Sequence, residues 1–269
     1  RLVSINDNLG RGYHLLPQSD GTIIAEPGSA STPVLQTIGE IRVTDALLVT
    51  PKRLDVKTGA VALRDQPSGQ AAYTSLAEVL RRGAEVQLDL DPSELTTGLT
   101  PLRLPLFGAE EPDAKAQVAA AVFLADTAEN GAGYAVELGQ AAQFETLLKN
   151  TLEDLRNLWD SPDHIERCDT SCPDCLRAYD NSRKHALLDW RLALDMLELC
   201  TGEELTISRS LPQTAMWMET SAQSLMGSAV SCIEGIPAIT RNGTCVLLFH
   251  PLWRLEPAVF NDAQAAALA

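Results

Sequence analysis

The feature that most constrains the fold is a group of three cysteines with the spacing C-x3-C-x2-C, at Cys168, Cys172 and Cys175. Thiolates at this spacing can converge on one tetrahedral Zn²⁺ when the chain between them turns sharply. Ser171 and Pro173 favour such a turn. Because a structural zinc site is closed by four ligands, the spacing predicts a metal-stapled loop that still requires one more donor.

Three residues are candidates for this fourth ligand. His185 is the first choice, because it begins the next predicted helix and could turn back towards the cysteines. His164, four residues before Cys168, is the second. Cys200 ranks only third, because it lies at the far end of the predicted helix, roughly 20 Å from His185. The predicted metal ligands are therefore Cys168, Cys172, Cys175 and His185, and the predicted cofactor is Zn²⁺.

Other interpretations of the thiols remain open beside zinc. The CPDC stretch has the form of a redox pair, but a redox dithiol usually opens a helix after a strand, whereas a predicted helix precedes this one. An iron–sulfur cluster would accept the spacing but requires a fourth cysteine. Inert buried thiols are the remaining alternative. Six cysteines in 269 residues are too few for a secreted disulfide scaffold, so we expect a reducing, cytoplasmic compartment.

The charge balance limits how the chain can contact nucleic acid. The net charge is −15, so the chain as a whole repels phosphate backbones, and any DNA contact must be local or supplied by another part of the assembly. Basic residues flank the cysteine loop, and Arg177, Arg183 and Lys184 are the candidate nucleic-acid-binding residues. The alternative is that they pair with nearby acids such as Asp180, and for Arg191 we favour pairing.

Strand patterns occur near both ends of the chain. The clearest alternation in the first fifty residues lies within 41–50, residues 2–7 and 22–27 show weaker versions, and residues 5–13 resemble a hairpin tip. Residues 120–127 form a compact apolar run typical of a buried strand. After Gly202 the pattern becomes β-rich again, and we predict strands at 204–210 and 244–250, with a tight turn at 241–244.

Helical spacing of apolar residues appears mainly in the middle of the chain. We predict helices over 69–90, from about 134, over 141–162 with Pro162 closing it, over 185–200, and from Asn261 or Asp262 to the end. Residues 108–116 are polar and predict a loop. No run reaches eighteen apolar residues, so the sequence predicts no membrane-spanning helix.

A glycine-containing turn follows the strand predicted at 120–127. Asp126, Gly131 and Gly133 lie between this strand and the next helix. Such a turn can hold a phosphate on backbone N–H groups, but the chain has neither GxxxxGK[ST] nor GxGxxG within a complete βαβ unit. We therefore predict that Asp126, Gly131 and Gly133 form a structural turn.

Two stretches together resemble the MrfA-like zinc-binding domain. These are VFLADTAENGAGYA and the motif C-x3-C-x2-C-L-x-x-Y-x-N-x3-H-x2-L-D. The motif is matched by Cys168, Cys172, Cys175, Leu176, Tyr179, Asn181, His185, Leu188 and Asp189. The resemblance covers residues 1 to about 200. Several relatives carry four clustered cysteines where this chain has three, so the resemblance implies either that His185 completes the site or that the metal is lost.

The resemblance implies a fold and a function. Domains of this family form the C-terminal part of many DEAD/DEAH-box helicases and occur in phage-defence proteins such as DrmB of DISARM and DruE of Druantia. We expect an α/β fold, with a mixed β-sheet, packed helices and a zinc knuckle. The expected divisions are a β-rich flank (1–50), a helicase-associated zinc-binding core (51–205) and a C-terminal β-rich extension (206–269).

The expected function is noncatalytic, because the chain has no ATPase motif. It would support DNA binding, or dock an ATP-dependent helicase motor, in a bacterial DNA-processing or antiphage protein. One alternative is a metal-dependent nuclease built on Asp126, Glu129 and either His185 or His250; the other is a pure protein-interaction module. The chain starts at Arg1 and ends abruptly, so we expect a piece of something longer.

Overall fold

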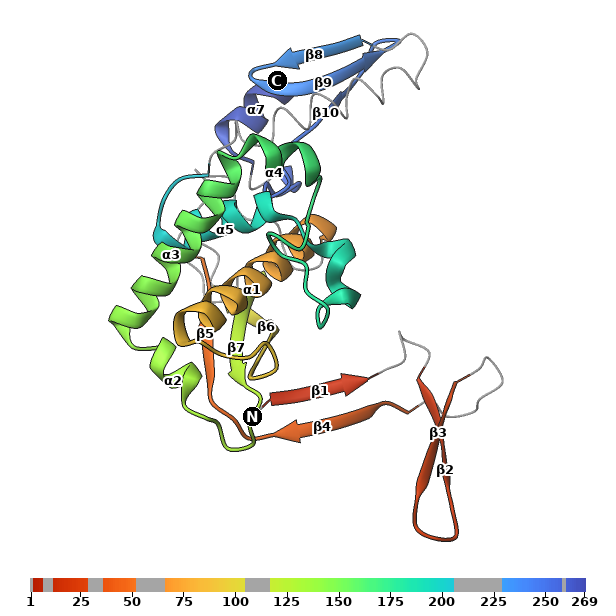
Figure 1. Cartoon of the computed structure of the whole chain (residues 1–269). Coiled ribbons are helices and arrows are strands. Elements are labelled where there is room, and N and C mark those ends of the chain that lie inside the picture. Colours follow the sequence, from red (N-terminus) through yellow and green to blue (C-terminus); the bar gives the residue numbers. More distant parts are fainter. Residues whose placement is uncertain are drawn as a thin grey trace.

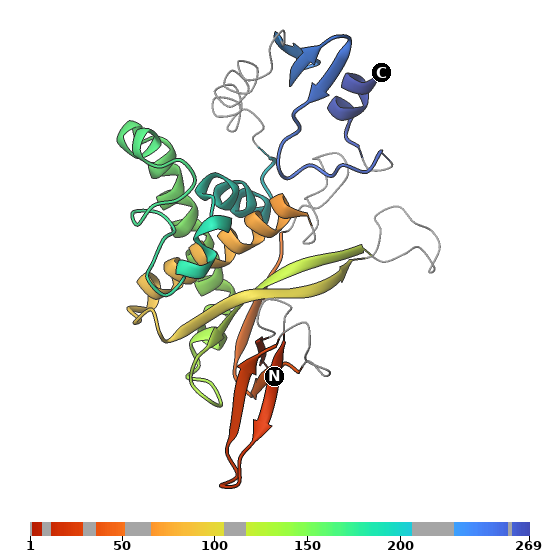
Figure 2. The same cartoon turned by 90° about the vertical axis from the view of Figure 1, so that its right-hand side faces the viewer.

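A computed structural model of the chain describes residues 2–6, 12–28, 36–51, 66–104, 117–205, 229–257 and 260–269. Figures 1 and 2 show a helical centre packed on a sheet, two β-ribbons at the N-terminal end, and a small sheet with a short helix at the C-terminal end. The α/β class and the β-rich N-terminal flank are therefore confirmed. Every described strand pair is antiparallel.

The central sheet has the strand order β5-β7-β6, formed by β5 (Ala46–Val49), β7 (Gln117–Asp126) and β6 (Leu95–Leu104). The predicted buried strand at 120–127 is confirmed as part of β7. Its apolar run is explained by burial, because Val122 and Leu124 are fully covered. Figure 2 shows the long β6–β7 pair running beneath the helices.

Helix α1 (Pro67–Leu88) is the centre of the core. It packs against β6 and β7 on one side and against α3 (Ala141–Trp159) and α5 (Trp190–Thr201) on the other. The helix predicted at 69–90 is thus confirmed within two residues at each end. Gly83 allows α1 and α3 to approach closely, since a Cβ atom built there would clash with the Thr151 Oγ1.

The predicted helices around the cysteines are subdivided in the structure. Pro162 does not close the preceding helix but begins a new one, α4 (Pro162–Arg167), and α3 ends at Trp159. The single helix predicted over 185–200 is wrong: a 3₁₀ helix η2 (Ser182–Leu187) precedes α5. Asp189 separates them because its backbone is extended and its carboxylate caps the backbone N–H groups of α5. The short helix α2 (Tyr134–Leu138) starts where it was predicted.

The N-terminal strands pair differently from the prediction. β1 (Leu2–Asn6) pairs with β4 (Ile38–Arg42), and β2 (Tyr13–Pro17) pairs with β3 (Ile23–Pro27), so β1 and β2 do not form a hairpin with each other. Most of the predicted tip, residues 7–11, lies outside the described residues. The strong pattern at 41–50 serves two sheets, because the chain leaves β4 before it enters β5.

The C-terminal residues form a three-stranded sheet with the order β10-β9-β8. Its strands are β8 (Ala229–Ile233), β9 (Ile236–Arg241) and β10 (Thr244–Leu247), and the predicted tight turn is confirmed by positive φ at Asn242 and Gly243. The final helix α7 (Asp262–Leu268) begins with a capping box on Asn261, as predicted. The predicted loop at 108–116 and the predicted strand after residue 205 lie outside the described residues.

No helix among the described residues combines the length and the apolar content that crossing a bilayer requires.

Candidate metal centre

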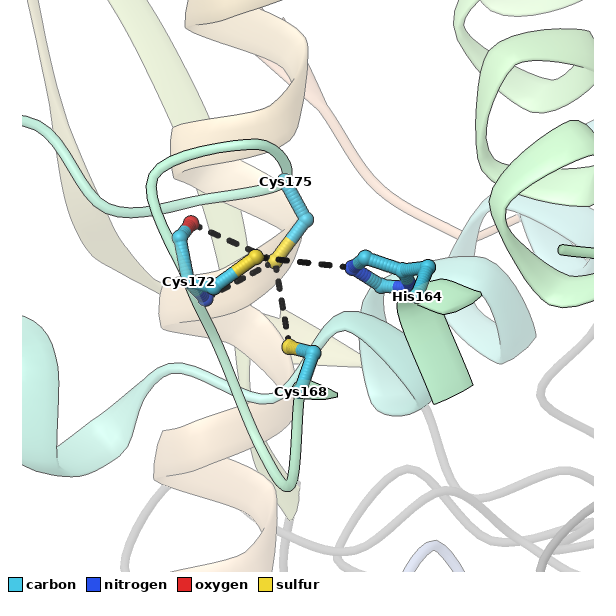
Figure 3. A group of neighbouring side chains, drawn as sticks. All are labelled: His164, Cys168, Cys172 and Cys175. Atoms are coloured by element: carbon cyan, nitrogen blue, oxygen red, sulfur yellow. Dashed lines mark hydrogen bonds between the residues drawn. The ribbon is translucent and has the colours of Figure 1, made fainter. Parts of the chain in front are cut away.

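Four side chains converge next to α4 (Figure 3): those of His164, Cys168, Cys172 and Cys175. His164 lies on α4, whose N-terminus is capped by Ser161, and Cys168 ends the helix by donating its N–H to the His164 carbonyl. One helical turn therefore separates these two residues, which places them on the same side of α4. Cys172 and Cys175 follow in the loop that returns over them.

The distances within this cluster fit a tetrahedral zinc ion. All four donor atoms lie within 4.8 Å of one another. The Sγ atoms of Cys168 and Cys175 are 3.8 Å apart, and the Cys172 Sγ is 3.6 Å from the His164 Nε2. Zinc bonds of ordinary length at tetrahedral angles would place two sulfurs about 3.8 Å apart, and a sulfur and a nitrogen about 3.6 Å apart. The donor set thus matches Zn²⁺ in both chemistry and spacing.

A tight backbone turn brings the last two cysteines together. The Cys172 carbonyl accepts hydrogen bonds from the backbone N–H groups of Cys175, Leu176 and Arg177. The Cys172 N–H in turn donates to the Cys175 Sγ at 3.1 Å. An N–H donor aimed at sulfur stabilises the thiolate form that binds metal. The turn predicted from Ser171 and Pro173 therefore has a direct function in positioning the sulfurs.

Burial opposes charge on these donors unless a cation is bound. Burial raises the pKa of the Cys168 thiol well above its usual range and also raises the pKa of Cys175. Burial lowers the pKa of His164, which keeps its imidazole neutral and able to ligate. A metal ligand must be a thiolate or a neutral imidazole, so a bound zinc ion would supply the positive charge that the buried thiolates lack.

The loop is held from both sides by helices α1 and α5. From α1, the Arg82 guanidinium donates to the carbonyls of Pro173 and Cys175 at 3.1 and 2.7 Å. From α5, the Trp190 N–H donates to the Thr170 carbonyl, and the Arg191 guanidinium donates to the Asp169 carbonyl. The cluster therefore lies at the junction of α1, α4 and α5.

The indole of Trp190 also orients the histidine. The His164 and Trp190 rings meet edge to face, with their centroids 4.9 Å apart, and Trp190 is fully buried. The Arg191 guanidinium lies over the same indole at 4.6 Å, which explains why Arg191 is not available on the surface.

The structure places the first-choice fourth ligand elsewhere. The His185 Nε2 lies 3.0 Å from the Ala178 carbonyl and 2.9 Å from the Asn181 Oδ1, outside the cluster. His164 takes the fourth position instead, because α4 packs directly against the cysteine loop. Cys200 is buried in α5, where burial raises the pKa of its thiol to about 12, and it does not join the cluster.

The basic candidates divide into two groups. The Lys184 ammonium donates to the buried Glu78 Oε1 at 2.6 Å and to the Thr97 carbonyl, so it is part of an internal network. Arg177 and Arg183 are exposed. The Arg177 Nε donates to the Ser171 hydroxyl, and Arg183 has no recorded hydrogen bond or ion pair in the described part of the chain.

The predicted structural turn is built around one carboxylate. Asp126, fully buried at the end of β7, accepts backbone N–H bonds from Ala132 and Gly133 on Oδ2, both at 2.7 Å, and from Ala135 on Oδ1 at 2.9 Å. Gly131 and Gly133 have φ values of 81° and 91°, which favour glycine. The backbone N–H groups are therefore occupied by Asp126 rather than open to a phosphate.

Sequence reasoning missed the buried polar side chains that hold the loop after the cysteines. Glu78 and Arg81 are buried on α1, and Arg81 pairs with Glu78, Glu85 and Asp180. Asn181 donates to the Glu78 Oε2 at 3.0 Å. The only signal was a Glu and an Arg three residues apart within the apolar helical pattern, which also fits a solvated surface.

Comparison with known proteins shows that this centre is similar to that of a known family. Residues 76–176, which contain all four donors, match the family model of the MrfA Zn-binding domain. Over 129 residues the chain is 37% identical to the Druantia protein DruE of Escherichia coli (strain UMEA 4076-1), a match that covers 47% of this chain and 6% of DruE.

Two solved structures also align with the chain. The DUF1998 helicase MrfA bound to DNA and AMPPNP gives a TM-score of 0.34 at 12% identity, over 70% of this chain and 21% of that one. MrfA bound to DNA gives 0.32 at 15% identity, over 67% and 19%. The chain thus spans a small part of each relative.

Proposed function

We propose that the chain is a noncatalytic, helicase-associated part of a bacterial DNA-processing or antiphage protein, because residues 76–176 match the MrfA Zn-binding domain and hold a cluster of one histidine and three cysteines that fits zinc. It would act in the cytoplasm, where it supports DNA binding or docks an ATP-dependent helicase motor. The motor would belong to another part of the protein or to a partner, since this chain has no ATPase motif.

The observation that carries this proposal is that the four donors are all protein side chains within 4.8 Å of one another, with two of the pairs at the separations of a tetrahedral zinc site. Structural zinc sites are closed in this way, whereas catalytic zinc keeps one position open for water or substrate. Zinc in this cluster would therefore cross-link α4 to the returning loop. Through Arg82 and Trp190 it would also fix that loop between α1 and α5.

We also propose the three divisions at 1–50, 51–205 and 206–269. Residues 76–176 fall within the second, and all four donors and the packed helices α1, α3 and α5 lie there. The first contains the two N-terminal ribbons and β5, and the third contains the sheet β10-β9-β8.

The nuclease alternative finds less support in the geometry. The Asp126 carboxylate is fully buried and already accepts three backbone N–H bonds, so it is poorly placed to bind a catalytic cation. His185 contacts Asn181, and the buried His250 lies 3.3 Å from the Asp195 carboxylate. Glu129 is exposed in the turn after β7. These groups do not form one site.

A direct test compares the purified chain with Cys172→Ser. We expect about one zinc per native chain by elemental analysis and a large loss in the variant. We expect the native, zinc-loaded chain to shift single-stranded DNA at low salt and to cleave nothing with added Mg²⁺ or Mn²⁺. A metal-free native chain would refute the proposal. Cleavage abolished by Asp126→Ala would favour the nuclease, and absence of a DNA shift would favour motor docking or a protein-interaction module.

A further inference from the structure

One side chain of the cysteine loop faces solvent almost completely. Tyr179 is 97% exposed, more than any other large hydrophobic side chain in the described parts of the chain, and the next, Val86, is 76% exposed. Tyr179 follows Cys175 by four residues and precedes η2 by three. Its ring therefore stands on the segment that connects the zinc cluster to α5.

This segment is rigid because one buried amide ties it together. The Asn181 Nδ2 donates to the Leu176 carbonyl at 2.9 Å, and its Oδ1 accepts the Ala178 N–H at 2.9 Å. The same Oδ1 lies 2.9 Å from the His185 Nε2, and the Ser182 N–H donates to the Tyr179 carbonyl. The backbone on both sides of Tyr179 is thus fixed, while its side chain makes almost no contact.

The fixed segment is also anchored to the core. Asn181 bonds to Glu78, a buried residue of α1. Asp180, the neighbour of Tyr179, has its carboxylate 2.8 Å from the buried Arg81 guanidinium. The only acid next to the tyrosine in sequence is therefore paired with Arg81, which it shares with Glu78 and Glu85.

Two arginines flank this tyrosine. Arg177 uses one of its five N–H donors on Ser171, and Arg183 uses none within the described residues. Arg177 lies within about 7 Å of Tyr179 along the backbone. Tyr179 thus lies within four residues of two exposed arginines, in a stretch that also carries the exposed Asp174 and Asp180.

We propose that Tyr179 is a stacking platform for a base of single-stranded DNA, with Arg177 and Arg183 contacting the neighbouring phosphates; this rests on the DNA contact in the proposed function. Non-specific single-strand sites combine positive charge with exposed aromatic rings, because every base offers a π-face. A tyrosine held on a rigid loop loses little conformational freedom on binding, since only two side-chain torsions are fixed. Arg177 and Arg183 precede and follow Tyr179 in the sequence. Their positive charges favour a partner that carries phosphates over a protein surface that has no acidic residues.

The test measures binding of the zinc-loaded chain to a fluorescein-labelled oligothymidylate by anisotropy, over a series of salt concentrations. Tyr179→Ala should weaken binding by about 5- to 150-fold, the range found when one stacking aromatic is removed. It should leave the slope of log affinity against log salt unchanged. Tyr179→Phe should bind like the native chain, because stacking uses the ring. Arg183→Ala should reduce the salt slope by about 0.7, the loss of one phosphate contact.

Controls separate this idea from a folding defect and from the broader proposal. Tyr179→Ala should keep its zinc and its melting temperature, because the side chain is exposed. Arg241→Ala, at an exposed arginine on β9, should change neither affinity nor slope. Unchanged affinity in Tyr179→Ala, or equal losses in the Phe and Ala variants, would overturn the platform and point to a protein partner. If the native chain leaves the oligonucleotide unbound, the DNA contact fails too, while the zinc role is judged by metal content.

Discussion

Replacing His164 by alanine should weaken zinc binding by a factor that can be worked out from the site. Structural zinc sites in small domains bind with an apparent free energy of about 10–16 kcal/mol. The cluster has four donors, so an equal division assigns about 2.5–4 kcal/mol to the imidazole, or about 10²- to 10³-fold in Kd. Water can occupy the vacated position, so the remaining three thiolates should still bind zinc weakly.

Competition with a chromogenic zinc chelator measures this difference directly. The matched control is His185→Ala. It also removes an imidazole, but from a residue whose Nε2 lies 2.9 Å from the Asn181 Oδ1 and outside the zinc cluster. We expect His185→Ala to lower the free energy of unfolding by about 1 kcal/mol, the value of one hydrogen bond, without changing zinc affinity. If His185→Ala released zinc as readily as His164→Ala, the assignment of the fourth donor would be wrong.

Three further predictions concern stability. Asp126→Asn should lower the free energy of unfolding by about 2–4 kcal/mol, because an amide cannot accept all three N–H bonds; Asp160→Asn, at an exposed cap, should stay within about 0.5 kcal/mol, and urea unfolding measures both. Gly83→Ala should destabilise by about 1–3 kcal/mol through overpacking against the Thr151 Oγ1. Thr151→Ala should restore part of this stability in the double variant, because the new Cβ atom would still lie 3.1 Å from the Leu147 Cδ1, and a thermal melt of all three variants would show it. Burial raises the pKa of Asp189 above its usual 3.8, so its favourable contribution is present at low pH and lost as pH rises through the raised value. Asp189→Asn keeps the cap and should gain stability relative to the native chain from pH 3.8 upwards, and urea titrations that show no such trend would contradict the assignment.

The three cysteines could be predicted because their convergence depends on local chain geometry. Their spacing allows one tight turn, and the structure shows that turn, with the Cys172 carbonyl bonded to the following N–H groups. The same is true of Asp126 and its glycines, where positive φ is needed within a few residues of a strand end. The family resemblance rested on these local motifs, and the family match confirms it.

The fourth donor could not be ranked correctly because its position depends on packing. His185 follows the cysteines by ten residues, and its location is set by Asn181 and Glu78, which lie 103 positions apart in the sequence. A signal for His164 did exist. It precedes Cys168 by four residues, and in a helix this spacing places both side chains on one face. The signal was lost because we predicted that Pro162 ends the helix before it, whereas Pro162 begins α4.

The basic residues show the same limit for charged groups. Arg183 and Lys184 are adjacent in the sequence, yet Lys184 is paired with Glu78 on α1 while Arg183 is exposed without a recorded partner in the described part of the chain. Which of two neighbouring cations turns inward is decided by the acid opposite it. That acid lies on a helix about a hundred residues earlier, and no local pattern reveals it. The pairing of β1 with β4 also joins residues that are distant in the sequence, so local patterns did not reveal it.

The proposed DNA contact would depend physically on the zinc cluster. The loop that carries Tyr179 begins at Leu176, directly after the zinc ligand Cys175. At its other end, the Asn181 amide donates to the Leu176 carbonyl and to the buried Glu78 carboxylate. Without zinc, only a weak sulfur contact at 3.8 Å would join the Cys168 and Cys175 side chains directly, so we expect the two thiols to move apart. The Arg82 bond to the Cys175 carbonyl would loosen as well. Ordering the tyrosine on binding a base would then cost free energy. If Tyr179 is the proposed platform, the metal would contribute to DNA affinity by keeping one aromatic ring in place rather than by touching the strand.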